Sequence, residues 1–182
     1  MNAVAAYGLL AHGLIFGALV ALLPLGGLRQ RAALTATALA LIAGIAPVMH
    51  GTFGTPSLTL LQLALLHLAN RAPSPLTYRP ALGLLIFALL FYPAALGWGA
   101  FDPYALGYQP WPLLAALVPL AGVLWWQRQD VWLIMLAVNL AAYATGAFAN
   151  LWDVLFDPLL VLLALIIVGR RVVTRLIASR IR

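Results

Sequence analysis

Aspartates and histidines are the side chains of this sequence best suited to acid–base or metal chemistry. Carboxylates and imidazoles that converge in a dry, shaped site can bind a divalent metal ion or relay protons. Asp153 and Asp157 lie four residues apart, so they share one helix face if the last helix begins before both of them. Asp102 and His50 fall in neighbouring loops on the same side, and His12 lies two to three turns into the first apolar segment. These five residues are candidates for binding a ligand or an ion.

A structural interpretation of the same residues is equally open. Asp102 and Asp157 each precede a proline, and an aspartate in that position commonly starts a turn or caps a helix. The sequence contains no metal-binding spacing such as HExxH. We therefore assign no catalytic residue, no metal site and no cofactor.

Three further polar side chains lie inside apolar segments. Gln62 and His67 belong to the third segment, and Asn139 lies in the middle of the sixth. A polar side chain in that environment is costly unless it faces a partner. These residues either line a cavity for a solute or bond neighbouring helices, and Asn139 is a plausible hydrogen-bond partner of Gln62. They complete the set of candidate ligand-binding residues.

The composition identifies the elements that must position these residues. Of the 182 residues, 65% are apolar and only 8% are charged, whereas soluble domains are about 45–50% apolar and about 25% charged. The mean hydropathy is +1.04. The protein is therefore expected to be an integral membrane protein with an all-α fold.

Absent residue types exclude several function classes. The chain contains no cysteine, lysine or glutamate, so disulfides, thiolate metal sites, cysteine nucleophiles and lysine Schiff bases are excluded. The net charge of +6 is carried by arginines that lie between apolar runs, which is typical of membrane topology and not of a nucleic-acid surface. No nucleic-acid partner is expected.

The apolar runs between charges predict a polytopic bundle of seven transmembrane helices over residues 1–169. Turn residues divide the longer runs into helical hairpins. The third span is short, so six crossings result if it does not fully cross. The predicted spans are 4–26, 32–48, 57–70, 80–97, 111–126, 131–148 and 152–169.

The positive-inside rule orients this bundle with its N-terminus outside and its C-terminus in the cytoplasm. In that orientation every arginine lies on a cytoplasmic segment, whereas three of the four aspartates lie outside. The bias toward Ala, Leu, Arg, Gly and Pro is typical of GC-rich bacterial genomes. The expected location is thus the inner membrane of a bacterium.

Two segments are suited to contacts with other helices or with lipid. Gly13, Gly17 and Ala21 recur every four residues, which permits close approach of a helix within the bundle or of a partner protein. The tail 170–182 is a basic amphipathic helix, expected to contact anionic lipids of the inner leaflet or to continue the last helix into a cytoplasmic partner. Its arginines are Arg170, Arg171, Arg175, Arg180 and Arg182.

Three functions are compatible with these features. The first is a non-catalytic subunit or scaffold of a larger cell-envelope complex, with other membrane subunits as partners. The second is a small transporter or solute-binding membrane component with a polar intramembrane cavity. The third is an enzyme that acts on lipid head groups or polyprenyl carriers at the outer face, using Asp153, Asp157 and His50.

Overall fold

A computed structural model describes residues 3–69 and 74–180, and every regular element in these ranges is a helix. Arg71 and Arg182, to which the sequence assigns cytoplasmic positions, lie outside the described residues. The α-helices are α1 (Ala3–Val20), α2 (Arg29–Ile42), α3 (Ile45–Phe53), α4 (Leu58–Ala69), α5 (Tyr78–Ala95), α6 (Pro110–Trp126), α7 (Asp130–Ala144), α8 (Leu151–Leu155) and α9 (Pro158–Arg180). Two short 3-10 helices, η1 (Gly26–Leu28) and η2 (Tyr104–Gly107), lie in connections.

Each predicted span overlaps helical residues, but two spans are divided between two helices and several bounds differ. The first predicted span ends at residue 26, whereas α1 ends at Val20. The chain then turns through Pro24, which cannot donate a backbone hydrogen bond, and Gly26, whose φ is +53°. The first helix is therefore shorter than the apolar run that contains it.

The second predicted span is interrupted by a sharp bend. The chain turns by 74° between η1–α2 and α3. Gly44 adopts φ +81°, a left-handed conformation that glycine reaches without steric cost, and it ends α2. Pro47 follows in the first turn of α3, where its missing N–H is tolerated. The prediction of one helix over 32–48 is therefore wrong, because Gly44 breaks it before Pro47.

The last predicted span is also divided. Phe156 is extended, with φ −153° and ψ 133°, and it separates α8 from α9. Asp153 lies in α8, whereas Asp157 immediately precedes α9. The two aspartates therefore do not share the face of one continuous helix. Beyond this break α9 continues without interruption to Arg180, so residues 170–180 extend the last span.

Among the residues that the structure describes, three helical segments are long and apolar enough to cross a membrane: Ala3–Val20, Tyr78–Ala95 and Leu151–Ser179. The bent pair formed by η1–α2 and α3 is a fourth if the two parts together make one span. The helices α4, α6 and α7 are apolar but shorter. A chain with three or four candidate membrane spans agrees with the expected membrane class.

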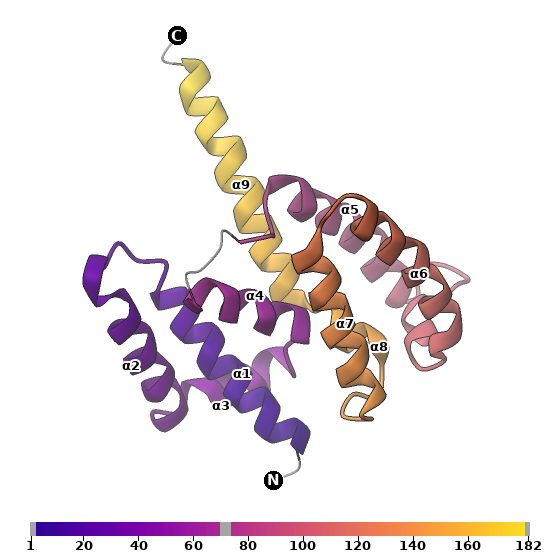
Figure 1. Cartoon of the computed structure of the whole chain (residues 1–182), viewed down its shortest axis with the longest axis horizontal. Helices are drawn as coiled ribbons and strands as arrows, with labels where there is room; N and C mark the ends of the chain where they lie inside the picture. The colour runs from indigo at the N-terminus through magenta and orange to yellow at the C-terminus, as the bar shows by residue number, and fades with distance from the viewer. Residues whose placement is uncertain (1–2, 70–73, 181–182) are drawn as a thin grey trace.

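The helices form two groups, and α4 of the first group contacts α7, α8 and α9. α1 packs against α2, α3 and α4, while α5 packs against α9 and α6 packs against α7. Figure 1 shows α1–α4 on one side and α5–α8 on the other, with α9 between them and projecting past both. The termini lie at opposite ends of the molecule. Buried side chains from α1, α4, α5 and α9 form the main core at this junction.

The contact between α1 and α2 depends on glycine. A Cβ atom on Gly17 would lie 2.1 Å from the Thr37 Oγ1 atom and 2.7 Å from the Ala33 carbonyl oxygen. A Cβ on Gly13 would lie 3.0 Å from Leu41. Both glycines therefore face α2 inside the fold, which is the internal alternative that their spacing left open.

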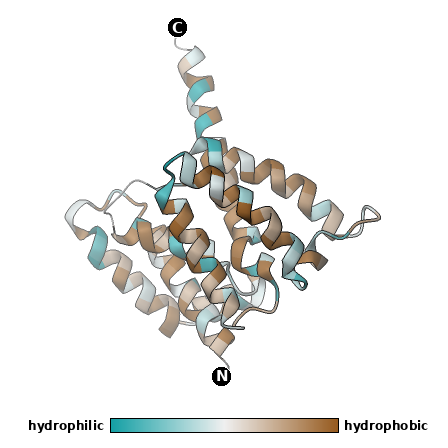
Figure 2. Cartoon of the chain, turned by 45° about the vertical axis from the view of Figure 1, so that its right-hand side comes forward, coloured by the Kyte–Doolittle hydropathy of each residue, from teal (hydrophilic) through white to brown (hydrophobic). Residues whose placement is uncertain are grey.

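Hydropathy is distributed along the helices as expected for a membrane protein. Figure 2 shows that apolar residues cover most of the helical body, whereas polar and apolar residues alternate along the projecting end of α9. That end carries Arg170, Arg171 and Arg175, with Val172 and Leu176 also exposed.

Candidate functional site

The loop between α3 and α4, in which Gly54 is exposed and Pro56 and Ser57 are buried, gathers three of the predicted polar residues: His12, His50 and Asp157. His12 Nε2 lies 2.9 Å and His50 Nδ1 lies 3.1 Å from the Gly54 carbonyl oxygen. Both nitrogens must carry a hydrogen, because a carbonyl oxygen only accepts. Tyr7 donates its hydroxyl hydrogen to the Pro56 carbonyl, 3.1 Å away. The two imidazoles thus bond the same backbone acceptor, at a place where the chain is not helical.

Asp157, immediately before α9, bonds the same loop. Its carboxylate accepts hydrogen bonds from the backbone N–H of Ser57 and from that of Leu160, the latter at 2.6 Å. The Ser57 hydroxyl in turn accepts from the Leu60 N–H, at 3.2 Å. Asp157 and Ser57 therefore cap α9 and α4, the structural role that an aspartate before a proline suggested.

One nitrogen in this cluster has no protein partner. His12 is fully buried, and its Nδ1 atom makes no hydrogen bond to any described residue. The His12 and His50 rings lie edge to face, with centroids 5.9 Å apart. Within residues 3–69 and 74–180, no group of three or more His or Asp side chains is arranged to hold a metal ion.

The polar residues within the apolar segments bond one another. Gln62 Nε2 donates to Asn139 Oδ1 at 2.7 Å, and Asn139 Nδ2 donates to the Thr59 hydroxyl at 2.8 Å. Thr59 donates onward to the Val154 carbonyl at 3.4 Å. The hydrogen bond predicted between Gln62 and Asn139 is therefore present, and this network joins α4 to α7 and α8.

A second polar group surrounds the loop between α5 and α6. Tyr104 donates its hydroxyl hydrogen to Asp153 at 2.8 Å, and Trp152 Nε1 donates to the Pro103 carbonyl at 2.9 Å. Burial and the bond to Asp153 raise the pKa of Tyr104, so its hydroxyl remains a donor. Asp102 accepts from the Tyr104 N–H at 2.9 Å and starts the turn into η2.

A cavity of about 750 Å³ adjoins this second group, and both Asp153 and Asp157 contribute to its wall. Tyr92 and Tyr104 line it as well. The outer-face acid–base hypothesis needs Asp153, Asp157 and His50 in one site. Instead, Asp153 bonds Tyr104, whereas Asp157 and His50 bond the loop between α3 and α4.

His67 lies at the opposite end of α4 and contacts Arg29. The Arg29 Nη2 atom donates to the His67 carbonyl at 2.8 Å and lies 3.2 Å from His67 Nε2. Arg29 Nε donates to the Ala21 carbonyl at 3.0 Å. Arg29 thereby links the end of α1 to the end of α4, and His67 lies beside a second cavity.

That cavity is a groove of about 950 Å³ among α1, α4, α5 and α9, which we call the four-helix groove. Most of its wall is aliphatic: Ile15, Ala18, Leu19, Leu22, Met49, Leu60, Leu63, Ala64, Leu76, Leu159, Leu162, Leu163, Ile166 and Ile167. Leu60, Leu63 and Ala64 are buried and form its floor. Leu22 and Ile166 are exposed and form its rim.

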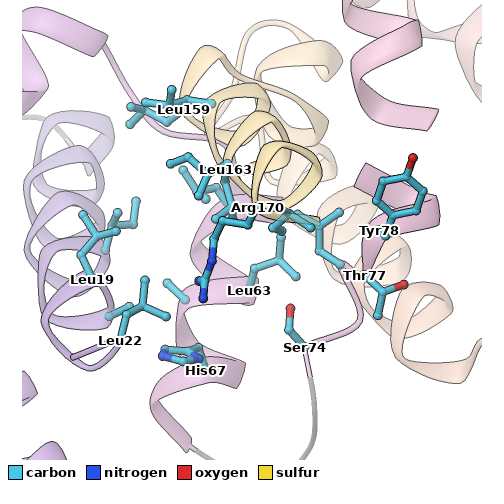
Figure 3. Close-up of a pocket in the computed structure, with 18 of the residues that line it drawn as sticks. Leu19, Leu22, Leu63, His67, Ser74, Thr77, Tyr78, Leu159, Leu163 and Arg170 are labelled. Atoms are coloured by element: carbon cyan, nitrogen blue, oxygen red, sulfur yellow. The ribbon is translucent and has the colours of Figure 1, made fainter. Parts of the chain in front are cut away.

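One end of the four-helix groove is basic. Arg79 from α5 and Arg170, Arg171 and Arg175 from α9 line it together with His67. Figure 3 shows Arg170 extending from α9 into the groove toward His67, between the leucines of α1 and α4. The residues that line the groove include four arginines and no carboxylate.

The sequence predicted several residues that line this groove, but it did not predict that they line one groove together. It selected His67, Arg170, Arg171 and Arg175, but the first as a polar intramembrane residue and the others as a lipid-facing tail. It missed Arg79 and the aliphatic wall, because ordinary apolar residues carry no motif and become a groove only when four helices assemble.

The other candidate residues predicted from the sequence do not line the four-helix groove. Gln62 and Asn139 lie in the α4–α7 network, and the aspartates and the other histidines lie in the polar groups described above.

Compared with protein-family models, with curated proteins and with solved structures, the chain gives no match.

Proposed function

We propose that the protein is a multi-pass membrane protein that binds an amphiphilic solute in the four-helix groove. The observation that carries this proposal is the groove itself, with a volume of about 950 Å³ and a largely aliphatic wall. That volume lies at the upper end of the range of small-molecule sites, which are typically apolar with a few convergent polar groups.

The shape of the wall supports a solute that enters from the membrane. The floor on α4 is buried, whereas Leu19 on α1 and Leu162 on α9 are each 48% exposed at the rim. An opening flanked by exposed leucines allows an apolar chain to enter sideways from the bilayer. The sequence predicted a polar cavity lined by residues such as Gln62 and Asn139. These two side chains instead bond each other, and the groove has a largely aliphatic wall.

The proposal includes the topology inferred from the sequence: seven crossings in a bacterial inner membrane, with the N-terminus outside and the C-terminus in the cytoplasm. Arg29, Arg79, Arg128 and the arginines of α9 would then lie on the cytoplasmic side. The positions of the termini at opposite ends of the molecule support an odd number of crossings.

A matched pair of substitutions on α9 tests the groove. Leu162 lines it and Leu165 does not, yet their exposed fractions are similar, 48% and 55%. We expect Leu162→Trp to fill the groove and Leu165→Trp to leave it open. Native mass spectrometry of protein extracted in mild detergent measures the amphiphile that each variant retains.

The expected result is a bound amphiphile mass on the wild-type protein and on Leu165→Trp, and its loss from Leu162→Trp. Equal retention by both variants, at equal thermal stability, would contradict the proposal.

A second candidate function is that of a non-catalytic subunit in a larger cell-envelope complex, and α6 favours it. α6 packs against α7 and η2, and Leu113 is its only buried residue. It is also one of the helices too short to qualify as a span. A partner helix against α6 would cover backbone groups that a short helix leaves in the bilayer. Co-purification of a second polypeptide at fixed stoichiometry would support this function, and a reproducibly monodisperse lone chain would contradict it.

A further inference from the structure

We infer that the basic end of the four-helix groove binds the phosphate group of a lipid, whose apolar chains occupy the aliphatic part. This inference rests on the proposed function and specifies its ligand. Phosphate oxygens are strong acceptors for guanidinium groups, and arginine binds them through two parallel hydrogen bonds.

No carboxylate among the described residues that line the groove balances the charge at this end. None of Arg79, Arg170, Arg171 and Arg175 forms an ion pair or a side-chain hydrogen bond to another described residue. The Arg175 guanidinium lies over the Tyr78 ring, 5.5 Å from its centroid, which places it without using its N–H donors. The Ser74 and Thr77 side chains line the same end and add hydroxyl donors.

Ordinary explanations for helix-terminal arginines do not account for this cluster. A helix dipole favours cations only in its last turn, whereas Arg170 and Arg171 lie more than two turns before Arg180. Arg171 and Arg175 are four residues apart, and like charges at that spacing destabilise a helix. The positive-inside rule requires cytoplasmic arginines, but it does not require those of α5 and α9 to converge on one groove. An anion between them would offset the repulsion.

The continuity of basic and apolar walls favours a lipid over a soluble phosphate compound. Along α9 the lining extends from Leu159 to Arg175, a rise of roughly 24 Å at 1.5 Å per residue. A free anion would contact only the arginine end of this length. A carboxylate would be satisfied by a single bidentate arginine, whereas four guanidinium groups suit the larger number of phosphate oxygens.

Competition for a fluorescent phosphatidic acid tests the inference in detergent micelles. The competitors are dioleoyl phosphatidic acid, dioleoylglycerol and inorganic phosphate, so that the two lipids differ only in the phosphate group. We expect phosphatidic acid to compete at least about tenfold better than dioleoylglycerol, since a charge-assisted hydrogen bond of the usual strength accounts for that factor. Inorganic phosphate at the same concentrations should have no effect.

Substitution of one groove arginine tests the same contact from the protein side. Arg170→Gln removes the guanidinium that extends into the groove, and we expect it to weaken phosphatidic acid binding by about tenfold. Arg31→Gln is the matched control, because Arg31 is an exposed arginine that does not line the groove. Dioleoylglycerol binding should be the same in both variants.

The outcomes separate this inference from the proposed function. If phosphatidic acid and dioleoylglycerol compete equally, or if Arg170→Gln binds like Arg31→Gln, the phosphate inference is wrong while groove binding stands. Competition by inorganic phosphate alone would overturn the lipid part of the inference. If Leu162→Trp also leaves phosphatidic acid binding unchanged, the groove is not the site and both proposals fail.

Discussion

Individual polar side chains in this protein compensate for a break in the helical backbone. His12, His50 and Tyr7 donate to carbonyls of the loop between α3 and α4, and Asp157 accepts from its last amide. An unpaired backbone group buried away from water costs about as much as a lost hydrogen bond. These residue types resemble an active site in the sequence because both roles bring polar side chains together between apolar segments.

Asp157→Asn tests this role at a single residue. The substitution keeps the size of the side chain but removes its charge and one of its two acceptor atoms, so one of the two backbone N–H groups loses its partner. We expect the free energy of unfolding to fall by about 1.5–3 kcal/mol, the range for hydrogen bonds to charged groups. Unfolding in mixed detergent micelles with increasing dodecyl sulfate measures the change.

Asp130→Asn is the control, since Asp130 is exposed at the start of α7. An equal effect of the two substitutions would show that charge alone, and not the capped loop, sets the stability.

At the scale of elements, close contact between α1 and α2 depends on the absence of side chains. Gly17→Ala places a methyl group against the Ala33 carbonyl oxygen, which is backbone and cannot rotate away. Overpacking of this kind usually costs about 1–3 kcal/mol. We therefore expect the micelle unfolding midpoint of Gly17→Ala to fall below that of the wild type.

Gly83→Ala provides the comparison within α5. Nothing lies within 4 Å of the position of its added Cβ, and alanine favours a helix over glycine by up to about 1 kcal/mol. Gly83→Ala should thus be neutral or stabilising. A stabilising effect at both positions would mean that α1 and α2 do not approach each other this closely.

At the scale of the whole molecule, the proposed topology is open to direct labelling. The chain has no cysteine, so each introduced cysteine is a unique site for a membrane-impermeant maleimide. Thr52 and Ser74 are exposed positions on either side of α4, and Ser179 lies near the end of α9. In spheroplasts, we expect Thr52→Cys to react at once and Ser74→Cys and Ser179→Cys to react only after permeabilisation.

Labelling of Thr52→Cys and Ser74→Cys from the same side would show that α4 does not cross. If Thr52→Cys is protected and Ser74→Cys reacts in intact spheroplasts, the orientation is opposite to the one proposed.

Sequence patterns located the helices better than their interruptions. Charges and turn residues bounded α4, α5, α6 and α7 to within four residues, because apolar length is a local property, whereas α1 ends six residues before its predicted end and two predicted spans are divided. Gly44 did not stand out among the other glycines of an apolar run, and Phe156 carries no signal of an extended conformation. Asn139 was identified as a partner of Gln62 because two isolated amides in apolar segments need each other.

The four-helix groove was not predictable in the same way. It depends on how α1, α4, α5 and α9 assemble, and aliphatic residues that face a groove look the same in a sequence as those that face lipid. Only its arginines carried a signal, and their convergence from α5 and α9 required tertiary structure.

The bond between Ser57 and Asp157 has a consequence for biogenesis. Its partners are 100 residues apart, so at about 5–20 residues per second the ribosome needs about 5–20 s between synthesising one and the other. During that time the Ser57 amide, which is buried in the final fold, lacks its final acceptor. The loop before α4 should therefore reach its final conformation only after Asp157 and α9 have been synthesised.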